Sequence, residues 1–154
     1  MSAVESRLAE KGLTLPEVAV PVAAYIPAVK SGNLVFTSGQ LPSVSGQLIA
    51  AGHVGAEVDP ETANKCAQQC ALNALAAIKS VIGDLDKVVR IVKVVGFVAA
   101  APGFVAVPPV VNGASELFAL AFGDAGVHAR SAVGVAELPL NAPVEVEVVV
   151  EVKN

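Results

Sequence analysis

A single arginine near the C-terminus is the side chain in this sequence best suited to chemistry on an acidic ligand. Arg130 lies in a stretch rich in Gly and Ala and is the only lysine or arginine between Lys93 and Lys153. In apolar surroundings an arginine needs an acidic partner, because an unpaired buried charge is costly. That partner is either a carboxylate of the same chain or the acid group of an anionic ligand, and the sequence leaves both alternatives open.

Glutamates on the last predicted strand supply candidate carboxylates. Residues 128–152 predict two neighbouring β-strands joined by the turn sequence LPLNAP, and in the second strand valines alternate with glutamates. A period of two gives a strand one apolar and one polar face. The polar face carries Glu145, Glu147 and Glu151. Only its position near the start of the strand distinguishes Glu145 as a candidate for catalysis.

Helix and turn signals earlier in the chain define the elements that must position these residues. The sequence Asp59-Pro60-Glu61 is a strong helix start, with an N-cap acid followed by proline at the first helical position, and Gly83 ends that helix. The valine-rich residues 87–99 predict a central strand. The remaining predicted elements are a short helix at about 2–11, strands at 25–30 and 33–38, a second long helix at 109–122 and the two final strands.

The order of these elements, β-β-α-β-α-β-β after a short helix, predicts an α+β fold in one domain covering residues 1–154. Two main helices and a mixed β-sheet make a two-layer sandwich with both helices on one face of the sheet. The other face is bare and rich in valine. Because 54% of the residues are hydrophobic and only 16% are charged, we expect part of the surface to be buried between subunits, where clefts are natural ligand sites.

Charge and composition argue against nucleic acid and membrane as partners. The formal net charge is −4, tryptophan is absent and Lys and Arg are not clustered, whereas phosphate backbones require grouped cations. Residues 94–111 are uncharged and long enough for a membrane span, but Gly96 and the pair Pro108-Pro109 interrupt them. Neither a signal peptide nor a disulfide framework is apparent, which predicts a cytoplasmic protein.

The cysteines and histidines of the sequence favour structural roles. Cys66 and Cys70 lie four residues apart in the first long helix without a nearby Cys or His partner, so we expect small core residues rather than a metal site. His53 falls in a predicted loop and His128 lies close to Arg130. For both, a place at the surface is the simpler expectation than a role as a base.

Four blocks of sequence together resemble the Rid/YjgF family of reactive-intermediate (enamine/imine) deaminases. They are NLVFTSGQLP at 33–42 with Tyr25 before it, Asn112, ARSAVGVAELP at 129–139 and VEVE at 144–147, and the similarity spans about residues 22–152. The resemblance implies a chorismate-mutase-like α+β fold and a homotrimer with its sites at the subunit interfaces. It implies neither a metal nor an organic cofactor, because a protonated imine is already electrophilic.

The same resemblance implies roles for individual residues. Arg130 matches the arginine that holds the substrate carboxylate, to which a guanidinium donates two parallel charge-assisted hydrogen bonds. Glu145 matches the acid that aligns water and shuttles a proton to the leaving amine. The predicted pocket lining consists of Tyr25, Ser38, Asn112 and the main chain around Ala132, which helps to hold the imine nitrogen.

Structural roles compete with each of these assignments. They are an ion pair between Arg130 and a strand glutamate, a merely solvated Glu145, an interface role for Tyr25, satisfaction of strand-end backbone groups by Ser38 and helix capping by Asn112. The sequence also departs from the family pattern at Ala132, where cysteine is common, and at Gly134, where an acid is common. The N-terminal helix at about 2–11 and a longer segment at 96–109 add to these departures, which indicate a divergent branch with an N-terminal extension.

The predicted function is hydrolysis of a reactive 2-imino or enamine acid to a 2-keto acid and ammonia. The ligand is accordingly a small 2-imino or 2-keto acid. A non-catalytic trimeric module that binds small carboxylates or a partner protein is the alternative. Endoribonuclease activity or inhibition of translation, attributed to some members of the family, is disfavoured by the acidic net charge and the missing basic patch.

Overall fold

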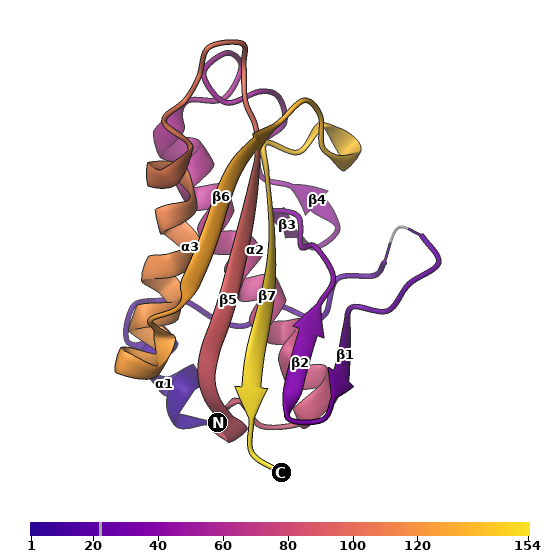
Figure 1. Cartoon of the computed structure of the whole chain (residues 1–154), viewed down its shortest axis with the longest axis vertical. Helices are drawn as coiled ribbons and strands as arrows, with labels where there is room; N and C mark the ends of the chain where they lie inside the picture. The colour runs from indigo at the N-terminus through magenta and orange to yellow at the C-terminus, as the bar shows by residue number, and fades with distance from the viewer. Residues whose placement is uncertain (22) are drawn as a thin grey trace.

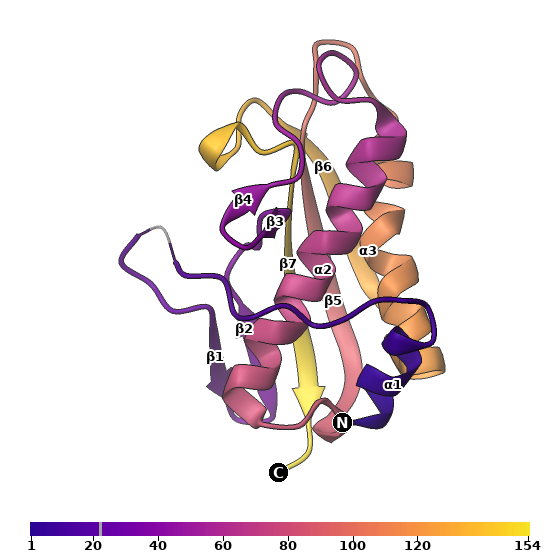
Figure 2. The ribbon, with the colours of Figure 1, turned by 180° about the vertical axis from the view of Figure 1, so that it is seen from behind.

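Five strands form one sheet with two long helices on one of its faces in the computed structural model, which describes residues 1–21 and 23–154 (Figure 1). Their spatial order is β1-β2-β7-β5-β6. The strands are β1 (Ala28–Ser31), β2 (Leu34–Thr37), β5 (Val88–Ala99), β6 (Ala129–Val135) and β7 (Val144–Val152). Figure 1 looks onto the face without helices, and Figure 2 shows the helical layer from behind. The predicted α+β two-layer sandwich with a mixed sheet is confirmed.

The helical layer consists of α2 (Pro60–Ile82) and α3 (Val107–Phe122), and local sequence sets their ends. Asp59 Oδ1 accepts a hydrogen bond of 2.8 Å from the backbone N–H of Thr62, and Gly83 follows α2 with a φ of +84°, where glycine is favoured. The second helix begins before the predicted start at 109. Proline is tolerated there because the first N–H groups of a helix have no partner within it.

Shorter elements complete the fold. They are α1 (Ala3–Ala9), the hairpin of β3 (Ser43–Val44) and β4 (Gln47–Leu48), and the 3-10 turns η1 (Leu85–Lys87), η2 (Gly123–Gly126) and η3 (Pro139–Asn141). The first two strands are shorter than predicted and meet at a turn in which Gly32 has a φ of +59°. Residue 22, where the family resemblance begins, lies outside the described residues. Within 1–21 and 23–154 no helix combines the length and apolarity needed to cross a membrane.

The prediction that the last two strands are neighbours is wrong, because β5 lies between β6 and β7. β6 runs parallel to β5, a pairing that needs a crossover connection, and α3 supplies it. β7 pairs antiparallel with β5 on the other side and takes the centre of the sheet that the sequence assigned to residues 87–99. Val94 stands in register with both Arg130 and Val148. Because β5 contains no acidic residue, Arg130 has no carboxylate on the strand beside it.

The core lies between the sheet and the helical layer. It is built from valines of β5 and β7 and small residues of α2, among them Val94, Val98, Val144, Val146, Val148, Ala67 and Ala71. A Cβ on Gly96 would lie 2.5 Å from Val111 Cγ1, so β5 and α3 approach more closely than a side chain at position 96 would allow. Cys66 and Cys70 are buried and free, as predicted, and burial raises the pKa of the Cys66 thiol to about 11.

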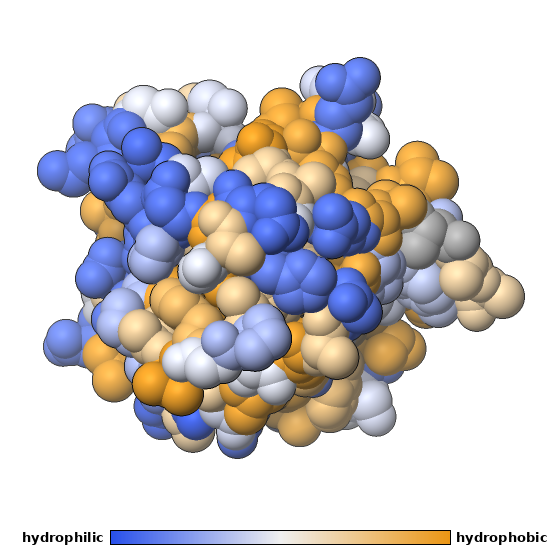
Figure 3. Space-filling view, turned by 90° about the horizontal axis from the view of Figure 1, so that it is seen from above, coloured by the Kyte–Doolittle hydropathy of each residue, from blue (hydrophilic) through white to orange (hydrophobic). Residues whose placement is uncertain are grey.

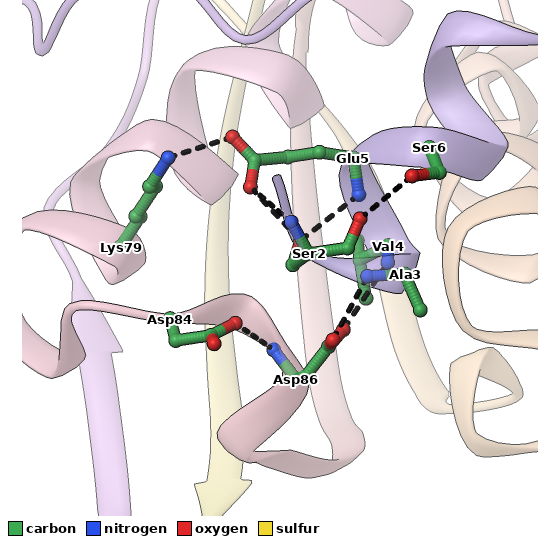
Figure 4. A network of polar contacts seen from close by, with 8 residues as sticks. All are labelled: Ser2, Ala3, Val4, Glu5, Ser6, Lys79, Asp84 and Asp86. Carbon is green, nitrogen blue, oxygen red and sulfur yellow. Dashed lines mark hydrogen bonds and ion pairs between the residues drawn. The ribbon is translucent and has the colours of Figure 1, made fainter.

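A network of polar contacts fastens α1 to the rest of the chain (Figure 4). Ser2 Oγ accepts from the backbone N–H of Glu5, and Glu5 Oε2 accepts from the backbone N–H of Ser2, each at 3.0 Å, which forms a capping box. Asp86 accepts from the first two backbone N–H groups of the helix at 2.8 and 3.2 Å. Lys79 of α2 donates to Glu5 Oε1 at 2.6 Å, so α1 is tied to two separate elements.

Candidate active site

Arg130 extends from the edge strand β6 onto the side of α3, and these two elements lie together at the left of Figure 1. Its Nη1 donates to Asn112 Oδ1 at 2.8 Å and to Ser115 Oγ at 3.2 Å, and its Nη2 donates to the main-chain carbonyl of Pro108 at 3.5 Å. Asn112 and Ser115 are three residues apart, so one turn of helix presents both. These contacts orient the guanidinium plane before any ligand arrives.

The guanidinium of Arg130 is half-buried and pairs with no carboxylate among residues 1–21 and 23–154. Within those residues the Nε–H of Arg130 donates to no group, and Nη2 makes only the 3.5 Å contact with Pro108. Nε and Nη2 lie on the same edge of the guanidinium, and a pair of N–H groups on that edge can match the two oxygens of a carboxylate. A hollow of about 310 Å³ opens beside the side chain, lined by Ser115, Ala119, Gly126, Val127, His128 and Arg130. The internal ion pair considered from the sequence is therefore not formed within the described chain.

Ser115 and His128 extend the contacts of Arg130, and the sequence analysis missed Ser115 as a site residue. Ser115 Oγ lies 2.9 Å from His128 Nε2, and His128 Nδ1 lies 2.6 Å from the carbonyl oxygen of Gly126. The prediction of a surface histidine is wrong for His128, which is half-buried against Phe118 with the two rings edge to face. Burial lowers the pKa of His128, the hydrogen bond to the Gly126 carbonyl opposes this with a smaller effect, and the positive charge of Arg130 adds the smallest contribution to the lowering. The sequence feature that could have indicated Ser115 is its spacing of three residues from Asn112, which places both on one side of a helix.

Glu145 is the second residue of the centre strand β7, and its carboxylate packs over the backbone of Gly39. A Cβ added to Gly39 would lie 2.5 Å from Glu145 Oε2, so only glycine leaves this space to the carboxylate. Burial, and to a smaller extent the charge of Glu147, raise the pKa of Glu145. A half-buried carboxylate with a raised pKa exchanges protons closer to neutral pH than a solvated one does.

Ser38 and Tyr25 lie on the same side of the molecule as Glu145. Ser38 Oγ donates to the main-chain carbonyl of Ile26 at 2.6 Å, and its backbone N–H donates to that of Pro27 at 2.8 Å. This agrees with the strand-end role considered for Ser38. Tyr25 lines a small hollow of about 50 Å³ together with Gly39 and is 44% exposed, so part of this residue is accessible to a ligand or to another chain.

Asn112 and Ala132 belong instead to the side of Arg130. α3 starts at Val107, so Asn112 lies in its second turn, and the capping role considered from the sequence is wrong. Ala132 stands opposite Gly96 in the neighbouring strand and is half-buried. Two groups of candidate residues result. Arg130, Asn112 and Ala132 form one, called here the arginine half-site, and Glu145, Ser38 and Tyr25 form the other, called the glutamate half-site.

The two half-sites lie on opposite faces of the sheet. Arg130 is in register with Val94, which is buried under the helices, and its side chain contacts α3. Glu145 alternates with Val144 and Val146, which are both fully buried under the helices, so its side chain leaves from the other face. The sheet therefore separates the guanidinium from the carboxylate within one chain.

An arm of the chain, residues 18–21 and 23–27, projects from the body next to the glutamate half-site (Figures 1 and 2). Val20 is 86% exposed and Ile26 is 61% exposed, and Figure 3 shows hydrophobic surface on this arm at the right of the view. The helix-free face of the sheet also exposes apolar side chains at Val29, Phe36 and Val133. Hydrophobic surface thus surrounds the glutamate half-site.

His53 lies away from both half-sites. One ring nitrogen donates to the main-chain carbonyl of Ala136 at 2.9 Å, and the exposed carboxylates of Glu57 and Glu137 lie 3.5 and 3.3 Å from the ring. These contacts raise the pKa of His53, most through the Ala136 carbonyl. His53 therefore contributes to a loop contact and not to the candidate site.

Comparisons with known proteins give one consistent result. The family model described as "YjgF/chorismate mutase-like, putative endoribonuclease" matches residues 5–152. Protein TCP17 of Trypanosoma cruzi is 40% identical over 152 residues, covering 98% of this chain and 95% of that protein. The 2-iminobutanoate/2-iminopropanoate deaminase of Dermatophagoides farinae is 32% identical over 142 residues, covering 92% and 95%. The crystal structure of Atu1372 from Agrobacterium tumefaciens is similar with a TM-score of 0.92 and 47% identity, covering 98% of this chain and 93% of that one.

Proposed function

Because the chain belongs to the YjgF/chorismate mutase-like family, we propose that it hydrolyses small 2-imino acids to 2-keto acids and ammonia, at sites formed between the chains of a homotrimer. The observation that carries the proposal is the state of Arg130. Its guanidinium is held by neutral groups of α3, has no acid partner in the described residues and keeps its Nε edge for a ligand. The similarity to the mite deaminase supports the choice of substrate class.

The position of Glu145 supports a site shared between chains. One small imino acid cannot contact Arg130 and Glu145 of the same chain, because the sheet lies between them. A cyclic trimer joins two different surfaces of the subunit at every interface, so the glutamate half-site of one chain can meet the arginine half-site of the next. The exposed arm and the apolar side chains on the helix-free face provide hydrophobic surface for such an interface.

The chemistry then follows from the two half-sites. Arg130 binds the substrate carboxylate, and the main chain around Ala132 holds the nitrogen of the protonated imine. Glu145 takes a proton from water as the water oxygen bonds to the imine carbon, and the electron pair of the C=N bond moves to nitrogen. The protonated Glu145 returns this proton to the amine. The C–N bond then breaks, and the hydroxyl proton leaves with ammonia as the keto group forms.

The pocket lining proposed from the sequence completes this arrangement. Asn112 acts through Arg130, whose Nη1 it holds at 2.8 Å. Tyr25 and Ser38 line the glutamate half-site, with Tyr25 supplying an exposed ring from the arm. The proposed step proceeds without a cofactor because the protonated imine already attracts the water oxygen.

A coupled assay tests the proposal. An amino-acid oxidase generates 2-iminopropanoate or 2-iminobutanoate, and its disappearance is followed with and without the protein. We expect wild-type protein to accelerate the loss of imine and Arg130→Ala to lower kcat/KM by about 30-fold or more, since hydrogen bonds to charged groups contribute ~2 kcal/mol. Arg90→Ala, which removes an exposed arginine of β5, is the matched control. Equal rates for wild type and Arg130→Ala would refute the proposal.

A carboxylate-binding module without catalysis is the second candidate. It is favoured by one observation: the arginine half-site is complete within a single chain, whereas Glu145 lies on the other face of the sheet. In that case 2-oxobutanoate would bind equally well to wild type and Glu145→Gln, and neither would accelerate imine loss. Endoribonuclease activity, which the family description includes, is disfavoured because 14 acidic residues outnumber 10 basic ones.

A further inference from the structure

A chain of hydrogen bonds runs from the guanidinium of Arg130 to the backbone of η2. Its three links are Arg130 Nη1 to Ser115 Oγ at 3.2 Å, Ser115 Oγ to His128 Nε2 at 2.9 Å, and His128 Nδ1 to the Gly126 carbonyl at 2.6 Å. None of the proposed chemistry uses Ser115 or His128. Both nevertheless lie between the arginine and a rigid backbone group, which is the place of residues that position a ligand-binding side chain.

The chemistry of the end groups fixes the direction of the two outer hydrogen bonds. The Gly126 carbonyl can only accept, so His128 Nδ1 carries a hydrogen, and in the neutral ring Nε2 is then an acceptor. A guanidinium can only donate, so Ser115 Oγ accepts from Arg130 and, when His128 is neutral, donates its own hydrogen to Nε2. Neutral His128 in the tautomer with hydrogen on Nδ1 therefore allows Ser115 to donate to the ring while it accepts from the guanidinium.

Packing holds the η2 end of this series of hydrogen bonds in place. A Cβ on Gly126 would overlap the main-chain oxygen of Phe118, so η2 lies directly against α3. The ring of Phe118 meets that of His128 edge to face, with centroids 5.9 Å apart and an angle of 90°. His128 therefore has little freedom to turn, and its Nε2 stays aimed at Ser115.

We propose that Ser115 and His128 are positioning residues for Arg130, and that neutral His128 is the form that holds the guanidinium ready for a carboxylate. Protonation would place a hydrogen on Nε2, which could then no longer accept from Ser115, and would set two cations on either side of one hydroxyl. Among the described residues, the charged group that acts on the ring is Arg130, which lies two positions further along the chain in β6. The surfaces facing the ring from α3 and η2 are Ser115, Phe118 and the Gly126 carbonyl, which are uncharged. The inference rests on the proposed binding of a substrate carboxylate by Arg130.

The first test measures binding of 2-oxobutanoate by calorimetry and the steady-state constants for the imine. We expect Ser115→Ala and His128→Phe to raise both Kd and KM about three- to tenfold, the usual effect of losing one hydrogen bond, with kcat within about twofold. Ser115→Thr, which keeps the hydroxyl, should restore wild-type affinity, and Ser80→Ala on α2 is the control. Unchanged Kd in Ser115→Ala and His128→Phe, together with lost binding in Arg130→Ala, would overturn the inference while leaving the proposed function intact.

The second test is independent of activity. Nitrogen NMR of the His128 ring should show the neutral tautomer with hydrogen on Nδ1, and the opposite tautomer would overturn the inference even if the enzyme is active. Between about pH 5 and pH 8, where 2-oxobutanoate stays ionised, its affinity should fall as His128 becomes protonated. His128→Gln, which retains an acceptor near the place of Nε2, should remove this pH dependence. An identical pH dependence in wild type and His128→Gln would also count against the proposal.

Discussion

Arg130 and Glu145 lie on opposite faces of one sheet, with β5 between the strands that carry them. Their separation predicts complementation between two inactive variants. In a cyclic trimer in which Arg130 of one chain works with Glu145 of the next, equal mixing of Arg130→Ala and Glu145→Ala chains restores about a quarter of the sites. The measurement is the rate of imine loss by co-expressed chains, compared with each variant alone. Sites contained within a single chain would give no recovery on mixing.

Glu145 predicts the acidic limb of the pH profile. As the ionised form accepts the proton of water, kcat should fall as pH drops through the pKa of Glu145, which burial and Glu147 raise. Glu147→Gln removes the smaller of these two causes, so the limb should move to lower pH with little change in the maximal rate. Glu145→Gln should lower kcat by about 100-fold or more with little change in KM. If the acidic limb of Glu147→Gln lies at the same pH as that of wild type, Glu145 is not the group whose protonation causes it.

Gly39 predicts a loss of activity without a loss of fold. Alanine at this position would place a Cβ 2.5 Å from Glu145 Oε2 and push the carboxylate aside, and the end of a glutamate side chain can move. We expect Gly39→Ala to lower kcat by about tenfold or more, the effect of a misplaced catalytic group. Thermal unfolding should stay close to that of wild type. Normal kcat in a folded Gly39→Ala protein would show that the observed position of the carboxylate is not required.

The contact between α1 and α2 predicts acid-sensitive stability. The hydrogen bond from Lys79 comes first among the causes that lower the pKa of Glu5 to about 2 from 4.5. A carboxyl whose pKa is lowered by folding stabilises the folded state fully above pH 4.5, and this stabilisation is lost as pH falls toward about 2. Glu5→Gln should lower the free energy of unfolding by about 1 kcal/mol at neutral pH, and less at low pH.

Denaturant unfolding at several pH values measures this effect. Lys65→Ala is the matched control, because Lys65 pairs with Glu61 on the exposed side of α2 at 3.9 Å, with both side chains mostly in solvent. Its unfolding curve should coincide with that of wild type. A difference between wild type and Glu5→Gln that does not shrink toward low pH would contradict the assigned role of the Lys79 contact.

Local signals predicted most of the elements of the fold. The sequence Asp59-Pro60 and the residue Gly83 act within one helical turn, and α2 ends where they indicate. The alternation along β7 gave the correct inward face, since Val144, Val146 and Val148 are all buried. Each of these signals depends on residues close in the chain, which is why the sequence was sufficient.

Strand order depended on information that alternation does not contain. A period of two tells which side chains share a face, but not which strand lies beside which. The turn between β6 and β7 suggested a hairpin, whereas the crossover through α3 makes β6 the parallel partner of β5. For the same reason the sequence did not show that Arg130 and Glu145 lie on opposite faces of the sheet. Which side chains of two strands share a face follows from the pairing and register of those strands.

The candidate site was predicted in part for a related reason. Asn112 was singled out through the family resemblance, and the structure brings it to Arg130. Ser115 was overlooked because a lone serine among apolar residues of a helix carries no signal by itself. Ser115 can be assigned to the site only once α3 is known to lie beside β6. Asn112 and Ser115, three residues apart on α3, then both face the guanidinium of Arg130.

The place of β7 has a consequence for synthesis of the protein. β7 pairs with β2 on one side and with β5 on the other. On the ribosome, the edges of β2 and β5 that pair with β7 therefore stay unpaired until residues 144–152 have left the exit tunnel. Nascent chains stalled before that point are expected to recruit chaperones or aggregate, and emergence of residues 144–152 completes the sheet.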